Sequence, residues 1–148
     1  MDSSDVREAT AELLRALGPH TDRDWAPVSA GSLEWSCRTT AAHIAHDLLA
    51  ALDASPADAR AWHWGPCDPT GFASMGTAEI LLHTHDITRG LAVEWLPPGA
   101  LCRRVLDRLF PDAPDGDPAA VLLWCTGRGD LDGRERRTSW TWRAALSG

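Results

Sequence analysis

Residues that start or stop helices divide this chain at short intervals, and this division restricts the folds open to it. Such residues stand at six points: Gly18-Pro19, Ser55-Pro56, Asp68-Pro69, Gly90, Pro111 and Gly127. Glycine and proline end helices, whereas aspartate before proline is typical of a helix start. The segments between these points repeat apolar residues at helical spacing, which predicts helices over 4–17, 36–53, 70–89, 98–110 and 118–124.

Two segments depart from the helical pattern. The link over 60–69 contains two tryptophans and is predicted to be irregular. Residues 134–143 alternate with a period of two, which places Trp140 and Trp142 on one face and predicts a strand after a turn at Asp132-Gly133. We therefore expect one mainly α domain over 1–148, an antiparallel bundle of four helices with a short fifth helix and a small C-terminal β element. The first helix, over 4–17, is expected to be capped by Ser3 or Ser4.

Composition excludes several classes of protein. The chain has 148 residues, 44% of them hydrophobic, and a net charge of −7, which suits a globular domain and disfavours nucleic acid as a partner. No segment approaches the roughly 20 apolar residues of a membrane helix, and the N-terminus lacks a signal-peptide pattern, so a cytoplasmic location is expected. The four cysteines are widely spaced and are predicted to be free thiols.

The helix predicted over 70–89 carries the most informative pattern. Its residues on one face are Phe72, Met75, Glu79, Leu82, His83 and Asp86. Two carboxylates and an imidazole thus interrupt a stripe that is otherwise typical of a core, where unpaired charge is costly. Because Glu79 and His83 are four residues apart, they are neighbours on the helix surface and can offer two ligands to one metal ion.

The helix predicted over 36–53 offers His43, His46 and Asp47. The apolar residues of this helix lie on its other side, so its polar face either meets water or lines a cavity, and periodicity does not decide between the two. A solvated His/Asp face beside a salt-bridged Glu79 is the alternative to a metal site.

Two segments resemble the DinB-like proteins, and in particular the N-terminal, metal-binding domain of mycothiol-dependent maleylpyruvate isomerases. They are WSCRTTAAHIAHDLLA, in which His43 follows Trp35 by eight residues, and MGTAEILLHTHDITRGL, which contains the Glu79–His83 pair. The resemblance implies a DinB-type four-helix bundle that holds a divalent ion by His43, Glu79 and His83. It also implies a thiol, mycothiol, as cosubstrate.

The usage of amino acids indicates the kind of organism that encodes this chain. All 14 basic residues are arginine, and lysine, asparagine, glutamine and tyrosine are absent. This usage indicates a GC-rich genome such as that of an actinobacterium, in which mycothiol is the abundant thiol.

The expected function is that of a metal- and thiol-dependent transferase or isomerase acting on a small electrophilic metabolite. Two histidines and one carboxylate suit Zn²⁺ and also accept Ni²⁺, Fe²⁺ or Mn²⁺, with open positions for a thiol. His46, Asp47 and Asp86 are candidates to support the ligands or to move a proton. The protein is expected to act as a monomer or homodimer. Two alternatives stay open, a hydrolase or lyase that uses metal-bound water and a non-catalytic metal- or ligand-binding protein.

Overall fold

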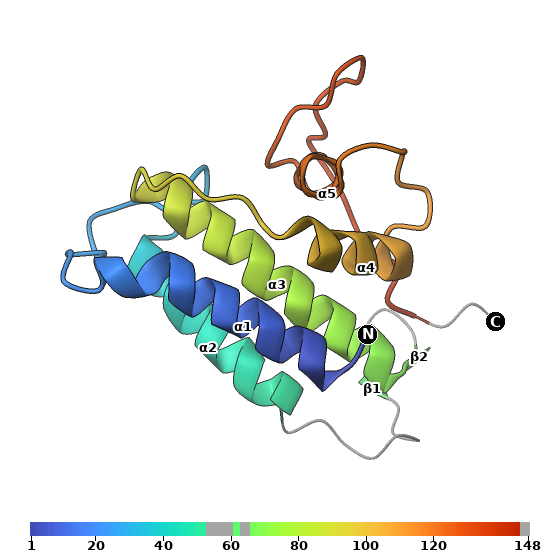
Figure 1. Ribbon diagram of the computed structural model, residues 1–148, viewed down its shortest axis with the longest axis horizontal. Helices are drawn as coiled ribbons and strands as arrows, with labels where there is room; N and C mark the ends of the chain where they lie inside the picture. Colours follow the sequence, from blue (N-terminus) through green and yellow to red (C-terminus); the bar gives the residue numbers. More distant parts are fainter. Residues whose placement is uncertain (53–60, 63–65, 146–148) are drawn as a thin grey trace.

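The computed structural model describes residues 1–52, 61–62 and 66–145, and the side chains of residues 1–45 and 67–145. The described chain is mainly helical, as predicted (Figure 1). Its helices are α1 (Ser3–Leu17), the short 3-10 helix η1 (Gly18–His20), α2 (Cys37–Leu52), α3 (Pro69–Gly90), α4 (Gly99–Leu109) and α5 (Pro118–Cys125). The predicted stop at Ser55-Pro56 lies outside the described residues.

Aspartates cap three of the helices. Asp68 and Asp117 accept a hydrogen bond from a backbone N–H in the first turn of α3 and α5, as the Asp-Pro pairs predict. In α1 the cap is Asp2, not Ser3 or Ser4, which corrects the prediction. The carboxylate of Asp2 accepts from the N–H of Ser4, and a second acid at Asp5 completes a reciprocal capping box.

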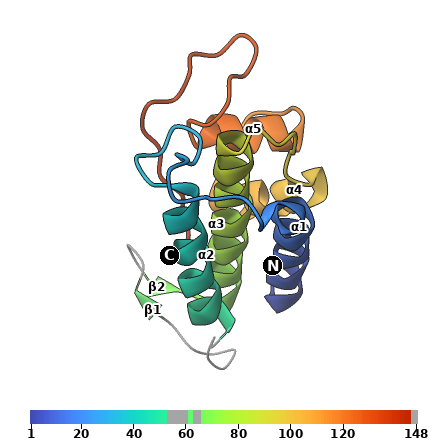
Figure 2. The same cartoon turned by 90° about the vertical axis from the view of Figure 1, so that its left-hand side faces the viewer.

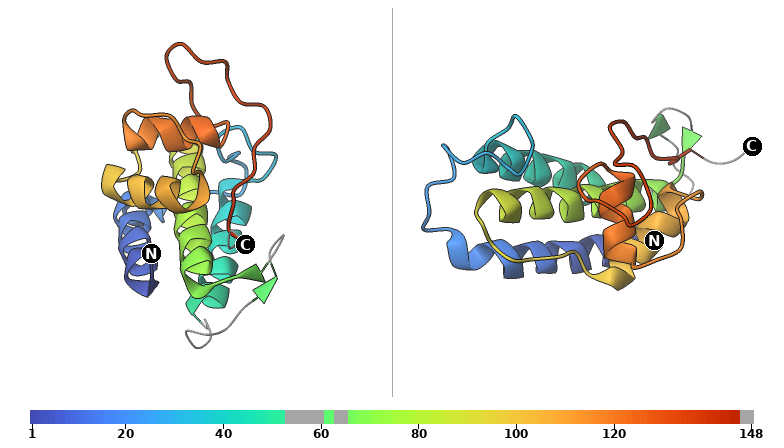
Figure 3. Two further views of the ribbon diagram at one scale, coloured as in Figure 1. Left: turned by 90° about the vertical axis from the view of Figure 1, so that its right-hand side faces the viewer. Right: turned by 90° about the horizontal axis from the view of Figure 1, so that it is seen from above.

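The three long helices lie side by side, with α3 in contact with both α1 and α2 (Figure 2). Their directions alternate along the chain (Figure 1). Helix α4 packs against α3, and α5 packs against α4 and crosses the direction of the long helices (Figure 3). Among the described residues, no helix combines the length and hydrophobicity that a membrane span requires.

Helix α3 is buried on nearly every side. From Ala73 to Thr88, every residue except Gly76 and Glu79 is buried. The stripe that the sequence predicted is therefore only part of the buried surface, since Thr77 and Thr84 on the opposite face are buried too. Each of these threonines donates its hydroxyl to the carbonyl four residues earlier in the helix, at 2.8 and 2.6 Å, which satisfies the buried polar group.

Strand structure is sparse and lies where the sequence did not predict it. Strands β1 (Ala61–Trp62) and β2 (Pro66–Cys67) pair antiparallel within the link predicted to be irregular. The predicted turn at Asp132-Gly133 is present, with φ +73° at Gly133 and a single bridge between Leu131 and Arg134.

The strand predicted for 134–143 is not observed in the described tail. The tail packs on helices instead of on a partner strand. The N–H of Arg143 donates to the carbonyl of Leu109, and the ring of Trp140 contacts Phe110. The alternation of Trp140 and Trp142 therefore reflects two rings in edge contact with each other, at 5.5 Å between centroids.

Close packing at the end of α3 leads to a stability prediction. A Cβ atom added to Gly90 would lie 2.1 Å from the carbonyl oxygen of Ser29 and 2.9 Å from the sulfur of Cys37. Since the first neighbour is backbone, we expect Gly90→Ala to reduce the free energy of unfolding by about 2 kcal/mol or more. Gly99→Ala, at a helical position with nothing within 4 Å, is the matched control and should leave stability unchanged or slightly raised. Urea denaturation of both variants measures the difference, and equal stabilities would contradict this packing.

Candidate metal centre

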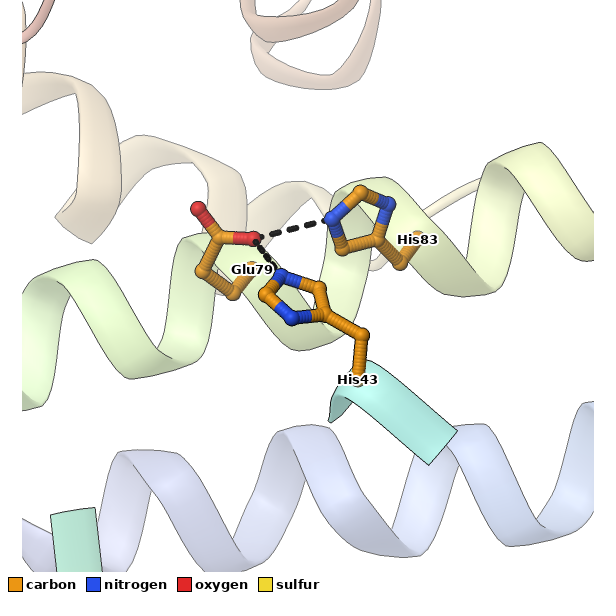
Figure 4. A group of neighbouring side chains, drawn as sticks. All are labelled: His43, Glu79 and His83. Carbon is orange, nitrogen blue, oxygen red and sulfur yellow. Dashed lines mark ion pairs between the residues drawn. The ribbon is translucent and has the colours of Figure 1, made fainter. Parts of the chain in front are cut away.

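Two helices bring His43, Glu79 and His83 together. Glu79 and His83 project from successive turns of α3, and His43 reaches them from α2 (Figure 4). One ligand atom of each residue lies within 4.8 Å of the others. The open question about α2 is thereby answered for His43, whose ring meets that of His83 at 5.2 Å between centroids.

The distances fit a metal ion with little rearrangement. Oε2 of Glu79 lies 3.0 Å from Nε2 of His83 and 3.7 Å from Nε2 of His43. A tetrahedral ion with bonds of about 2.0–2.2 Å holds its ligand atoms roughly 3.3–3.6 Å apart. The carboxylate between the two imidazoles therefore needs only a small shift to share an ion with both.

Exposure rises across the site from His83 to His43. The side chain of His83 is 11% exposed, that of Glu79 is 23% and that of His43 is 34%. The ring of Trp35, which is 46% exposed, meets the ring of His43 edge-on at 5.2 Å. The solvent side of the site is thus the His43 side, from which a small molecule could approach an ion held by the three side chains.

Asp86 holds His83 from the opposite side. Its Oδ2 lies 3.1 Å from Nδ1 of His83, so Nε2 is the nitrogen that faces Glu79. A carboxylate at the distal nitrogen of a histidine ligand fixes its ring and raises its basicity. Asp86, which the sequence predicted as a supporting or proton-moving residue, is in position to orient His83.

Arg128 completes this chain of contacts and was not predicted from the sequence. Its guanidinium binds both oxygens of Asp86, with Nη2 2.8 Å from Oδ2 and Nε 3.0 Å from Oδ1. The side chain of Asp86 is buried, at 4% exposed, and that of Arg128 is largely covered, at 11% exposed. Because Arg128 follows Asp86 by 42 residues, no local pattern could have pointed to the pair.

Neighbouring charged groups shift the pKa values of His83 and Asp86 in the direction that favours their charged forms. Burial alone would lower the pKa of His83, but its hydrogen bonds to Asp86 and Glu79 and their negative charges raise it to about 9. Burial would likewise raise the pKa of Asp86, yet the hydrogen bonds from His83 and Arg128 bring it below its ordinary value. At neutral pH His83 is therefore an imidazolium with a proton on each ring nitrogen, and a metal ion that binds Nε2 must displace the proton there.

Two other residues predicted for the site, His46 and Asp47, belong to α2, but their side chains lie outside the described residues. The cysteines are free and buried, as predicted: Cys37, Cys67, Cys102 and Cys125. Burial raises the pKa of all four thiols, that of Cys102 to about 12, so none of them is a thiolate at neutral pH.

Nothing matches this chain among protein-family models, curated proteins or solved structures. Three potential ligands meet at distances suited to one ion, one of them is oriented by a buried carboxylate, and one side is open to solvent. This arrangement can hold a divalent ion with coordination positions to spare.

Proposed function

We propose that this chain belongs with the DinB-like proteins and binds a divalent metal ion, Zn²⁺ in the first place, through His43, Glu79 and His83. The observation that carries the proposal is the convergence of these three side chains from α2 and α3. The eight-residue spacing of Trp35 and His43 also acquires a physical reason, because the two rings are in contact. Two imidazoles and a carboxylate are the ligand set of many catalytic zinc sites.

We further propose that the protein is a thiol-dependent transferase or isomerase, with mycothiol as the cosubstrate. The bound ion would supply Lewis acidity, which lowers the pKa of a thiol that coordinates it. The thiol has to come from outside, because the chain's own four thiols are buried and protonated. The exposed edge formed by His43 and Trp35 is the side from which it would approach.

The reaction proposed for this site has a simple balance. The thiol gives up its proton, its sulfur forms a bond to an electrophilic carbon of a small substrate, and the substrate gains a proton. In a transfer the S–C bond persists. In an isomerisation a carbon–carbon bond of the adduct rotates, the S–C bond then breaks, the substrate loses the proton it gained, and the thiol is regenerated. His83 stays fixed by Asp86 throughout, because Asp86 is itself held by Arg128.

Cobalt spectroscopy tests the thiol part of the proposal. Protein loaded with Co²⁺ should develop a thiolate-to-cobalt charge-transfer band when mycothiol is added at millimolar concentration, and the S-methylated thiol should give none. The band should be lost in His43→Ala, which removes the ligand on the open side. Absence of a band in the native protein, with the cobalt shown to be bound, would favour a hydrolase or a non-catalytic metal-binding protein.

A further inference from the structure

A second polar site lies at the C-terminal end of α3, on the other side of Asp86 from the metal ligands. A hollow with a volume of about 290 Å³ opens there between α3, the loop before α2 and the segment after α5. Its walls include Ser32, Asp86, Arg89, Arg128 and Arg136. None of the three proposed metal ligands lines it, so the hollow is distinct from the metal centre.

Positive charge is concentrated in this hollow. Three arginines line it against the single carboxylate of Asp86, in a chain whose net charge is −7. Arg128 is bound to Asp86, but the guanidinium of Arg89 makes no hydrogen bond or ion pair with another residue of the described part. Among the residues that the structure describes, Arg136 has only long contacts, 3.4 Å to the exposed Asp130 and 3.3 Å to the carbonyl of Gly127.

Close backbone packing fixes the part of the wall formed by Gly31 and Gly90. Gly31 has φ +55°, and a Cβ on it would lie 3.4 Å from the carbonyl oxygen of Asp86. Gly90 leaves no room for a Cβ against Ser29. His85, which is 7% exposed, also lines the hollow, and its Nδ1 has no hydrogen-bond partner in the described part of the chain. The hollow is therefore a shaped and incompletely satisfied polar site.

We propose that this hollow binds a small oxyanion, the carboxylate or phosphate group of a metabolite, through Arg89 and Arg136 with Arg128 behind them. A planar guanidinium matches both groups with paired hydrogen bonds. An anion there offsets the repulsion among three like charges, which Asp86 alone does not balance. The volume is close to the lower end of small-molecule sites, roughly 300–1,000 Å³, which suits one anionic group with a short attached chain.

Calorimetric titration of the full chain with inorganic phosphate and with succinate tests this proposal, with chloride at matched ionic strength as the reference. Saturable binding of at least one of the two anions is expected. Binding should weaken roughly tenfold or more in Arg89→Gln and in Arg136→Gln, since each loses a charged hydrogen-bond donor. Both arginines reach solvent, so the variants should fold. Arg7→Gln, an exposed arginine on α1, is the matched control and should bind as the native protein does.

The two anions identify the source of the bound group, and a metal-site variant separates the two sites. Phosphate binding alone assigns a phosphorylated ligand, and succinate binding alone assigns a carboxylate. Glu79→Ala should retain the anion, because Glu79 does not line the hollow. Loss of binding in Glu79→Ala would place the anion at the metal and overturn the proposal. So would the absence of saturable binding, or equal weakening in Arg7→Gln.

Discussion

Replacing Glu79 or His83 by alanine is expected to lower the affinity of the protein for Zn²⁺ at least tenfold. Each substitution removes one of the three side chains whose ligand atoms lie within 4.8 Å of one another. A tenfold loss is the lower end of the effect seen when residues that merely support metal ligands are changed, so loss of a ligand should exceed it. Competition between metal-free protein and a chromophoric chelator measures the affinity.

Two substitutions of the same chemistry serve as controls. His20→Ala changes a histidine in η1, and Glu94→Ala changes an exposed glutamate in the loop after α3. Neither residue belongs to the cluster, so both variants should bind Zn²⁺ as the native protein does. Unchanged affinity for Zn²⁺ in Glu79→Ala and His83→Ala would show that these residues are not metal ligands and would contradict the proposed site.

Asp86→Ala is expected to reduce the free energy of unfolding of the metal-free protein by roughly 3 kcal/mol or more. The substitution leaves the largely covered guanidinium of Arg128 without its carboxylate partner and His83 without its Nδ1 contact. Removal of one member of a buried ion pair has a large effect because the remaining charge stays buried and uncompensated. Urea denaturation in the presence of a chelator gives this free energy.

Asp112→Ala is the matched control for Asp86→Ala. Asp112 also pairs with an arginine, Arg143, but the two side chains are 74% and 67% exposed. Such a pair contributes about 1 kcal/mol or less. If Asp86→Ala were no more destabilising than Asp112→Ala, the pair of Asp86 and Arg128 would contribute no more to the free energy of unfolding than an exposed pair does, which would contradict this prediction. Asp86→Ala should also weaken Zn²⁺ binding about 10- to 100-fold, because His83 loses the group that orients it.

Local chemistry explains why the helices could be predicted from the sequence. Asp68 and Asp117 precede prolines at the starts of α3 and α5 and cap both helices, and Gly18 follows the last residue of α1. Glu79 and His83 could be paired for the same reason, since four residues on one helix fix their proximity without any knowledge of the fold. Local signals were thus sufficient to pair two of the three proposed ligands.

The rest of the site depends on contacts between distant segments. His43 meets Glu79 only because α2 packs on α3 with His43 turned toward it, which a helical period does not specify. Arg128 reaches Asp86 across 42 residues. The tail was predicted as a strand because Trp140 and Trp142 alternate, but tertiary contacts with Phe110 and the other ring account for their spacing. In each case a contact with a distant segment, and not the local sequence pattern, determines where the side chain lies.

A crystal of the protein grown with Zn²⁺ and measured at the zinc absorption edge tests the metal centre most directly. The account predicts one anomalous peak per chain at about 2.0–2.2 Å from Nε2 of His43, Nε2 of His83 and a carboxylate oxygen of Glu79. It also predicts that Nδ1 of His83 stays on Asp86, as it is now at 3.1 Å. A zinc peak at other residues, or no peak between these three in crystals saturated with zinc, would contradict it.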